Sequence, residues 1–510
     1  MDVIEFEILY KNLISIAEEM GVILQKSSYS PNIRERLDAS CAIFSGTQKL
    51  LAQAEHIPVH LGSMHLPLQY IAFEVNPEDQ IILNDPSMGG THLPDITIYK
   101  PVFHNDKIVA YIGTRAHHAD IGGMAPGSIP GNSVEIYQEG LIIPPSRIVV
   151  EGKNNRDVMA LILANTRTPY ERRGDLMAQI GANNYGAKMI TEFIARYGIE
   201  KYEALESEIL RYTRRMMTHR MESLPQGVFT GEDSLELNNG RVEIKVKITL
   251  DNKITVDFSG TQEACKGNIN APLAVTHSAV YFFFRTILCG DIPANSAFYE
   301  FFNIIAPPGT IVNAPRGAAV VGGNVETSQR LVDTMLLALS TAIDVPAQSH
   351  GTMNNISFGN SQFTFYETLG GGAGAANGYN GASGVHVYMT NTKNTPIEVI
   401  ETSYPLRCLE YSLRKNTGGA GKWCGGEGIV KHYRTLEPCI FSIISDRRQL
   451  APRGIKGGEK GIPGKNIVIK HGKRQIIDGK DTISLDKDDE VIIMTPGGGG
   501  YGLQTRDNQN

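Results

Sequence analysis

The chain has 510 residues, of which 41% are hydrophobic and 20% charged, and its formal net charge is -6. A chain of this length buries a large core and is expected to divide into lobes. The acidic balance leaves no basic face, which excludes a nucleic-acid partner.

The first 150 residues are predicted to combine one helix with several strands. Apolar residues at spacings of three and four predict an amphipathic helix from Phe6 to Leu24. Ser, Pro and Asn residues in 27–38 end this helix, and 39–44 is predicted as a strand. Further strands are predicted at 80–83 and 108–113, within a region of strands and loops.

Helices dominate the next part of the chain. Residues 170–222 are predicted as helical, and the adjacent Arg214 and Arg215 are expected on a solvated face. Two more helices are predicted at 276–288 and at 325–343. The last third of the chain is rich in glycine and in strand-like segments.

Alternation of apolar and polar residues from Val242 to Phe258 predicts antiparallel strands, with hairpin turns at 239–240 and 251–252. Together these elements predict an α+β fold with mixed sheets and helical segments in a large multi-lobed chain. A boundary near Pro225 would give an N-terminal lobe, 1–224, and a strand- and glycine-rich C-terminal lobe, 225–510.

Cysteine usage and hydropathy predict a cytoplasmic protein that does not enter a membrane. Acidic residues near the start replace the basic region of a secretory signal, and the most apolar stretch, 279–288, contains Arg285 and is too short to span a bilayer. No Cys-x-x-Cys pair occurs, which argues against a disulfide scaffold or a zinc ribbon. The six cysteines are Cys41, Cys265, Cys289, Cys408, Cys424 and Cys439.

Between Asn84 and Ser128 the chain concentrates metal-binding side chains among glycines and prolines. One cluster is Gly-Gly-Thr-His-Leu-Pro-Asp at 89–95, and the other is His-His-Ala-Asp-Ile-Gly-Gly at 117–123. Imidazole and carboxylate groups suit a borderline divalent ion such as manganese, zinc or iron(II). Each cluster lies beside a predicted strand, and neighbouring strands would bring the clusters together. The sequence therefore predicts a metal site on loops, and with it a chemical function.

Other interpretations of these histidines exist. A His-x-x-Asp pair such as His92 and Asp95 also occurs on protein surfaces, and one of His117 and His118 could be a hydrogen-bonded core residue. His104 is predicted as an exposed turn residue and is left out of the site.

The same motifs, with Asn-Asp-Pro at 84–86, resemble the hydantoinase B family. That family includes B subunits of ATP-dependent N-methylhydantoinases and lactamases, the second half of 5-oxoprolinases, and the large subunits of acetone and acetophenone carboxylases. The resemblance extends over nearly the whole chain through motifs at 165–169, 174–179, 257–261, 268–270, 308–313, 367–375, 390–392, 398–401 and 495–502.

The resemblance implies that His92, Asp95 and His117 hold the metal, manganese or zinc before iron, with an acidic residue just before the first strand as the fourth ligand. Glu35 is preferred there, because Asp38 could equally cap or turn the following strand. Three or four protein ligands would leave an open position for water or substrate.

Further residues are expected to act on the substrate. His118 and Asp120 are the catalytic candidates, although His117 and His118 could exchange roles because adjacent strand residues point to opposite faces. Asp85, Gly371 and Gly372 are candidates for substrate binding. Backbone amides of the glycine segment could cradle an anion, and a tight turn between strands explains the glycines equally well.

No Walker-type phosphate loop occurs in the sequence. The resemblance accordingly implies a partner, a hydantoinase A-type ATPase, which binds ATP and phosphorylates the carbonyl oxygen in an assembly with two copies of each chain. The segment 418–426 departs from many relatives, with Asn416 and Cys424 in place of an acidic residue and an arginine. Because of this departure, the resemblance does not determine which substrate the chain acts on.

The leading hypothesis is therefore the B subunit of an ATP-dependent cyclic amide hydrolase that opens a small-molecule hydantoin, lactam or 5-oxoproline ring. The alternative is the large subunit of an ATP-dependent ketone carboxylase, although the chain length favours the more compact hydrolase subunits. A third hypothesis is a scaffold with a structural metal that binds the A-type partner. A structural site is coordinatively closed, whereas a catalytic site keeps an exchangeable position.

Overall fold

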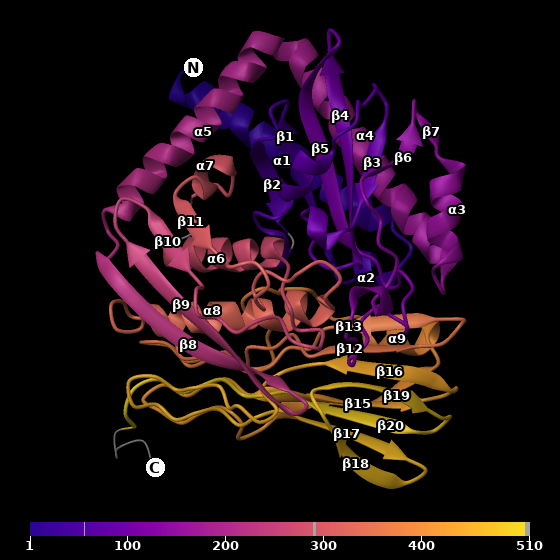
Figure 1. The fold of residues 1–510 in the computed structure, drawn as a ribbon, viewed down its shortest axis with the longest axis vertical. Coiled ribbons are helices and arrows are strands. Elements are labelled where there is room, and N and C mark those ends of the chain that lie inside the picture. Colours follow the sequence, from indigo (N-terminus) through magenta and orange to yellow (C-terminus); the bar gives the residue numbers. More distant parts are fainter. Residues whose placement is uncertain (56, 289–291, 505–510) are drawn as a thin grey trace.

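The computed structural model describes residues 1–55, 57–288 and 292–504 (Figure 1). Helix α1 (Val3–Ser27) confirms the first predicted helix and buries the apolar stripe that contains Phe6, Leu13 and Met20. The Asp2 side chain caps the helix by accepting a hydrogen bond from the Glu5 N–H. Cys289 lies outside the described residues.

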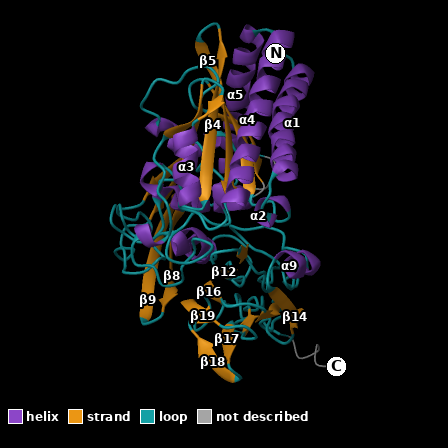
Figure 2. Ribbon diagram, turned by 90° about the vertical axis from the view of Figure 1, so that its right-hand side faces the viewer, coloured by secondary structure: helices purple, strands orange, loops and turns teal. Residues whose placement is uncertain are grey.

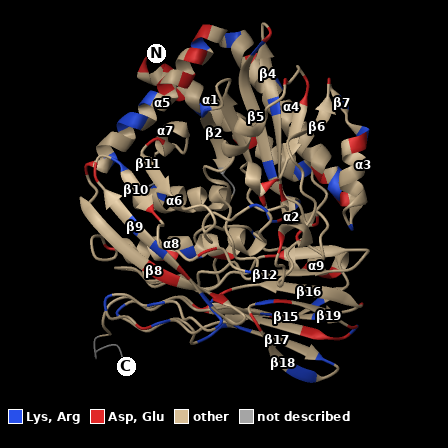
Figure 3. Ribbon diagram, in the orientation of Figure 1, with Lys and Arg blue, Asp and Glu red and all other residues tan. Residues whose placement is uncertain are grey.

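Three long helices form one layer of the N-terminal half. Helix α1 packs against α4 (Pro169–Tyr197), and α5 (Ile199–Met221) completes the layer (Figure 2). Figure 3 shows acidic and basic residues along α5, and Arg214 and Arg215 are exposed there as predicted. Because α4 also packs on β4 and β5, this layer covers one face of a sheet.

That sheet has seven strands in the order β2-β1-β5-β4-β3-β6-β7. The strands predicted at 80–83 and 108–113 correspond to β3 and β5, but they are not neighbours, because β4 lies between them. The bounds are β1 Ala39–Ser45, β2 Leu50–Glu55, β3 Gln80–Leu83, β4 Asp95–His104, β5 Lys107–His117, β6 Ser146–Val150 and β7 Lys153–Asn154.

A second sheet, in the order β11-β10-β9-β8, lies at mid-height on the left of Figure 1. Its hairpins confirm the two predicted turns: Leu237 pairs with Gly240, and Leu250 pairs with Ile254. Two helices, α6 and α8, pack on each other beside it, and a π-helical turn occupies the start of the helix predicted at 325–343. The bounds are β8 Gly227–Leu237, β9 Gly240–Leu250, β10 Ile254–Asp257, β11 Phe302–Ile305, α6 Leu273–Ile287, η5 Gly323–Thr327 and α8 Ser328–Leu339.

The C-terminal third forms two antiparallel sheets, β13-β12-β16-β19 and β14-β15-β20-β17-β18, at the foot of Figure 1. The bounds are β12 Asn355–Gly359, β13 Thr364–Glu367, β14 Leu406–Arg414, β15 Gly428–Thr435, β16 Cys439–Ile444, β17 Lys465–Lys470, β18 Lys473–Ile477, β19 Lys480–Leu485 and β20 Glu490–Met494. Short elements complete the fold: α2 Pro31–Arg34, η1 Pro58–His60, η2 Leu66–Tyr70, η3 Pro86–Met88, η4 Ile136–Gln138, α3 Arg156–Ala164, α7 Ser296–Tyr299 and α9 Ile397–Ser403.

Glycine-rich segments beside these sheets pack backbone against backbone. A Cβ atom on Gly372 would lie 2.0 Å from the Gly426 carbonyl oxygen, and one on Gly498 would lie 1.9 Å from the Ala373 carbonyl oxygen. No side chain fits at such separations. The abundance of glycine therefore has a packing cause in this part of the fold.

The predicted α+β class with mixed sheets in a large multi-lobed chain is confirmed. The largest hydrophobic cluster contains Leu61 and Met64 together with Phe258, Tyr281 and Met335, so it combines side chains from both sides of residue 225. The division into 1–224 and 225–510 stays a prediction. Among the described residues, no helix is both long and apolar enough to cross a membrane.

Candidate metal site

The candidate site begins with the register of three adjacent strands. Asp95 at the start of β4 pairs with His117 at the end of β5. On the other side of β5, Ala39 of β1 pairs with Ala116, and the His117 N–H donates to the Asp38 carbonyl oxygen at 3.0 Å. Side chains of directly opposed strand residues lie on the same face of a sheet. Asp38, His117 and Asp95 therefore form one row across the sheet.

Three ligand atoms converge at this row. The His92 Nε2 and His117 Nδ1 atoms are 3.0 Å apart, and the Asp95 Oδ1 atom lies 3.5 Å from the first and 3.3 Å from the second. Ligands at about 2.1 Å from a divalent ion lie roughly 3.0–3.4 Å from one another in tetrahedral or octahedral geometry. The three separations thus fit a shared metal ion. In the described part of the chain, these three residues are the group of histidine and acidic side chains that could hold one.

The electrostatics favour the protonation states that bind metal. Burial lowers the pKa of His92 to about 3, so its imidazole is neutral at physiological pH. Burial alone would raise the pKa of Asp95, but His92, His60 and hydrogen bonds from His117 and His60 outweigh it and hold the pKa well below its usual value. Neutral imidazoles and an ionised carboxylate are the forms that coordinate a divalent cation.

Neighbouring side chains hold the three residues in place. The Thr91 hydroxyl donates to Asp95 Oδ2 at 2.6 Å, which leaves Oδ1 directed at the histidines. The ring of Tyr366, from β13, stacks on the His117 ring at 4.5 Å between centroids. The Arg36 guanidinium lies 4.8 Å from the centre of the Tyr366 ring. The C-terminal half of the chain thus contributes directly to the position of His117.

His60 is a site residue that the sequence analysis missed. It is fully buried in η1, its Nε2 atom lies 3.4 Å from Asp95 Oδ2, and its Nδ1 atom is 3.0 Å from the Ser40 hydroxyl. No acidic residue precedes or follows it closely. The available signal was the presence of three histidines, at 56, 60 and 65, within ten residues.

The fold places Glu35 and Asp38 differently relative to His92, Asp95 and His117. Glu35 ends α2, and its partly exposed side chain pairs with Arg34 at 2.9 Å rather than with the histidines. Leu37 adopts a left-handed conformation with φ of 59°, which turns the chain into β1 and brings Asp38 beside His117. Burial raises the pKa of the Asp38 carboxyl, although His117 and Arg36 oppose that effect. Asp38 is therefore the acidic residue of this segment that adjoins the site.

His118 faces the opposite side of the sheet from His117. Its Nε2 atom is 2.9 Å from the side-chain oxygen of Gln179 on α4, and burial, followed by the nearby Arg172 charge, lowers its pKa to about 4. The geometry places His117, not His118, in the candidate metal group, which consists of His92, Asp95 and His117. His118 therefore lies beneath the helical layer, on the face of the sheet opposite to His117.

Asp120 is occupied by structural hydrogen bonds. Its carboxylate accepts from the Gly122, Gly127 and Arg167 N–H groups and from the Arg167 side chain at 2.9 Å. Asp85 caps η3 through the N–H and hydroxyl of Ser87, and it lines a cavity of 540 Å³. Both carboxylates thus fix the loops that flank the metal group.

The glycine segment does not offer free amides. The Gly371 N–H donates to the Val385 carbonyl and the Gly372 N–H to the Pro496 carbonyl, and the amides of 373, 374 and 375 are also paired within the protein. An anion cradle at Gly371 and Gly372 would require these bonds to break. The turn-like packing interpretation of this segment is the one that agrees with the hydrogen bonds.

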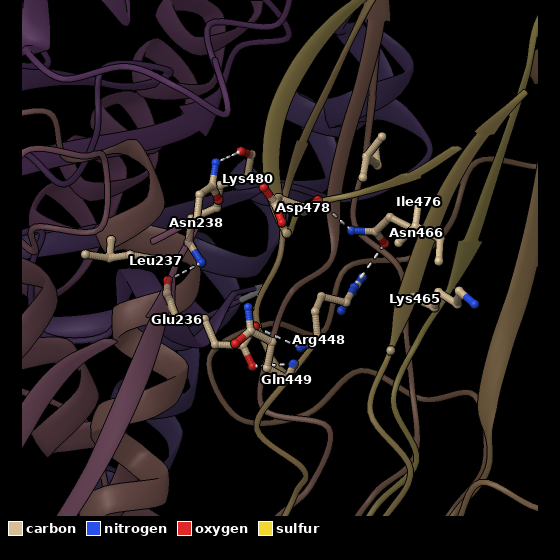
Figure 4. Close-up of a pocket in the computed structure, with 13 residues that line it drawn as sticks. Glu236, Leu237, Asn238, Arg448, Gln449, Lys465, Asn466, Ile476, Asp478 and Lys480 are labelled. Carbon is tan, nitrogen blue, oxygen red and sulfur yellow. Dashed lines mark hydrogen bonds between the residues drawn. The ribbon is translucent and has the colours of Figure 1, made fainter. Parts of the chain in front are cut away.

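A separate polar cavity of 270 Å³ lies between the end of β8 and the strands β17 to β19 (Figure 4). Glu236 accepts from the Arg448, Gln449 and Leu450 N–H groups, and Arg448 Nε donates to Asn466 at 3.0 Å. These groups satisfy one another and do not converge on a common point. The metal group remains the stronger candidate for chemistry.

Comparisons with known proteins show which proteins this chain is similar to. The family model described as Hydantoinase B/oxoprolinase matches residues 2–504. The chain is 39% identical to 5-oxoprolinase 1 of Arabidopsis thaliana, over 98% of this chain but 42% of that protein. It is 30% identical to the B component of a putative D-/L-hydantoinase of Pseudomonas sp. (strain NS671), over 98% and 90% of the two chains. The fold is similar to that of the ATP-dependent caprolactamase from Pseudomonas jessenii, with a TM-score of 0.93, 27% identity and coverage of 99% and 91%.

Proposed function

The chain belongs to the hydantoinase B/oxoprolinase family, and we propose that it is the metal-binding subunit of an ATP-dependent hydrolase that opens a cyclic amide. The observation that carries the proposal is the convergence of His92 Nε2, His117 Nδ1 and Asp95 Oδ1 within 4.8 Å of one another. The names of the relatives point to 5-oxoproline, a hydantoin or a lactam as the substrate class.

The chain's own residues would act mainly by positioning. His92, Asp95 and His117 would hold a divalent ion, manganese or zinc before iron, with Asp38 and His60 adjoining it. When bound, such an ion polarises a substrate oxygen and lowers the pKa of a coordinated water. His60 places Nε2 3.4 Å from Asp95 Oδ2, so this atom would hold or accept a proton during ring opening.

Activation of the amide would come from a partner. Ring amides resist hydrolysis, and the sequence has no Walker-type loop with which to bind ATP. An A-type ATPase would phosphorylate the carbonyl oxygen, and the two proteins would assemble as two copies of each in the cytoplasm. The Pseudomonas relative is named as one component of a hydantoinase, and this chain spans 42% of a longer 5-oxoprolinase; both facts support a division of labour.

Co-expression with an A-type partner tests the proposal. The complex is expected to open 5-oxoproline or a hydantoin ring only with ATP present, and each protein alone should be inactive. Ring opening should also disappear after removal of the metal by a chelator and return when manganese or zinc is added. ATP-dependent turnover by the isolated chain would contradict the proposed partnership, and full turnover without metal would contradict the role of the site.

A further inference from the structure

Arg115 differs from the other arginines that are fully buried in the described part of the chain. Arg172, Arg330 and Arg447 each pair with at least one aspartate at 2.7–3.3 Å. Arg36 has no such pair, but all its side-chain nitrogens donate to oxygen atoms. Among the described residues, Arg115 has no ion pair within 4.0 Å, and its Nη2 atom has no hydrogen-bond partner.

The register of the sheet places Arg115 directly beside the metal group. Arg115 pairs with Ser40 on β1 and with Thr97 on β4, which forms a second row next to Asp38, His117 and Asp95. Residues two apart on a strand lie on the same face. Arg115 thus lies on the metal-binding face, one row from His117.

Two hydrogen bonds fix the orientation of the guanidinium. Its Nε atom donates to the Thr97 hydroxyl at 2.8 Å, and its Nη1 atom donates to the Ser63 hydroxyl at 2.7 Å. Ser63 in turn donates to the His60 carbonyl oxygen at 3.0 Å. The remaining nitrogen, Nη2, is held in the interior with its donors unused.

An unpaired cation in the interior is energetically costly. Asp95 is an opposing charge near Arg115, but its carboxylate already faces the metal-binding histidines. With a divalent ion bound, Asp95 and Asp38 cannot neutralise both the metal and Arg115. The site would then carry positive charge that only an additional anion removes.

We propose that Arg115 Nη2 binds an anionic oxygen of the substrate, either a carboxylate or the phosphoryl group of the activated amide, beside the metal. This inference rests on the proposed function, because it names the chemistry that the site would accept. A guanidinium that is anchored through Nε and Nη1, with Nη2 free, presents a directed donor to a carboxylate or phosphate oxygen. The metal-binding residues are buried as deeply as Arg115, so an opening that admits substrate to one serves the other.

A binding experiment tests the proposal without ring opening. The manganese-loaded chain is titrated with inorganic phosphate, and paramagnetic broadening of the phosphorus resonance reports binding near the metal. We expect phosphate affinity to fall at least tenfold in Arg115→Gln at equal manganese occupancy, and to recover partly in Arg115→Lys. The control is Arg434→Gln, which removes a charge from a partly exposed pair with Glu490 and should leave phosphate binding unchanged.

Ring opening by the complex with the A-type partner separates the two sources of the anion. If Arg115 binds the phosphoryl group, Arg115→Gln should slow opening of 5-oxoproline and of 2-pyrrolidinone, which lacks the carboxylate, by similar factors. If it binds the carboxylate, only 5-oxoproline should be affected, through a raised KM. Unchanged phosphate affinity together with unchanged kinetics on both substrates would overturn the proposal.

The two experiments also separate this inference from the proposed function. An inactive wild-type complex would count against the hydrolase proposal, while the phosphate titration would still decide the role of Arg115. Should Arg115→Gln fail to fold, the phosphate affinity of Arg115→Lys tests the proposal instead. Lysine keeps the charge but lacks the fork that bonds Thr97, Ser63 and an anion together, so wild-type phosphate affinity in this variant would overturn the proposal.

Discussion

Asp95 and His117 oppose each other across the ladder between β4 and β5, with Asp95 Oδ1 3.3 Å from His117 Nδ1. The pair joins the start of one strand to the end of the next, so backbone hydrogen bonds of the sheet fix its geometry. The tight turn before β4 brings His92 next to this pair, because the Asp95 N–H donates to the His92 carbonyl oxygen. A site built on paired strands in this way is expected to be rigid before metal binds.

Removal of one metal-binding side chain should remove the metal. His92→Ala and Asp95→Ala are each expected to lose nearly all of about one bound divalent ion per chain, because the remaining groups lack a third ligand. Elemental analysis of the purified variants measures the occupancy. The matched control is His118→Ala, which should keep its metal because His118 contacts Gln179 on the other face of the sheet. Full metal occupancy in both test variants would show that His92 and Asp95 do not hold the metal.

Asp38 and Glu35 should differ in their effect on the metal. Asp38→Asn is expected to weaken metal affinity by about 10–100-fold, the range typical of groups that support metal ligands. Glu35→Gln should leave the affinity unchanged, because Glu35 pairs with Arg34 away from the histidines. Competition with a fluorescent chelator measures both values. If Glu35→Gln weakened metal affinity and Asp38→Asn did not, Glu35 would be the acidic residue of the site.

Glu139 should make stability depend on pH. Burial raises its pKa to about 8, although the Val320 and Val321 N–H groups and the Ser133 hydroxyl favour the ionised form. The folded state therefore keeps a proton that the unfolded state releases above about pH 4.5. This group's contribution to stability is complete below that pH, falls as pH rises toward 8, and is then constant.

Glu139→Gln is expected to remove that dependence. Between pH 5 and 8 the wild-type free energy of unfolding should lose about 1.4 kcal/mol per pH unit more than that of the variant. Urea denaturation at several pH values measures the two slopes. A wild-type protein that gains stability relative to the variant as pH rises would mean that the hydrogen bonds outweigh burial and that the pKa is lowered.

Two glycine substitutions should change the stability of the fold in opposite directions. Gly372→Ala is expected to prevent folding or to lower the melting temperature sharply, because its Cβ atom would lie 2.0 Å from a backbone carbonyl oxygen. Gly181→Ala lies on the exposed side of α4 with no atom within 4 Å of the new Cβ, so it should stabilise the helix by up to about 1 kcal/mol. Thermal melts compare them, and equal melting temperatures would contradict the packing of the glycine segments.

Local pattern was enough to predict several parts of this molecule. The period of the apolar residues predicted α1, and the Asn239-Gly240 turn between alternating segments predicted the β8-β9 hairpin. Both are determined by residues close together in the chain. Likewise, the crowding of imidazole and carboxylate groups at 92–95 and 117–118 indicated the metal group, because its chemistry is carried by residue type and short spacing.

Tertiary structure decided which other side chains join that group. Asp38 and Arg115 take their places because β1 and β4 pair on either side of β5, and His60 because η1 lies over that face. Periodicity does not state which strands become neighbours. From the sequence alone, Asp38 could equally cap or turn the following strand, and Glu35 is preferred for that reason. Strand order depends on long-range packing of the whole sheet against the helical layer. Residue types in the sequence thus indicate the kind of chemistry to expect, and the cross-strand register decides which side chains surround the candidate site.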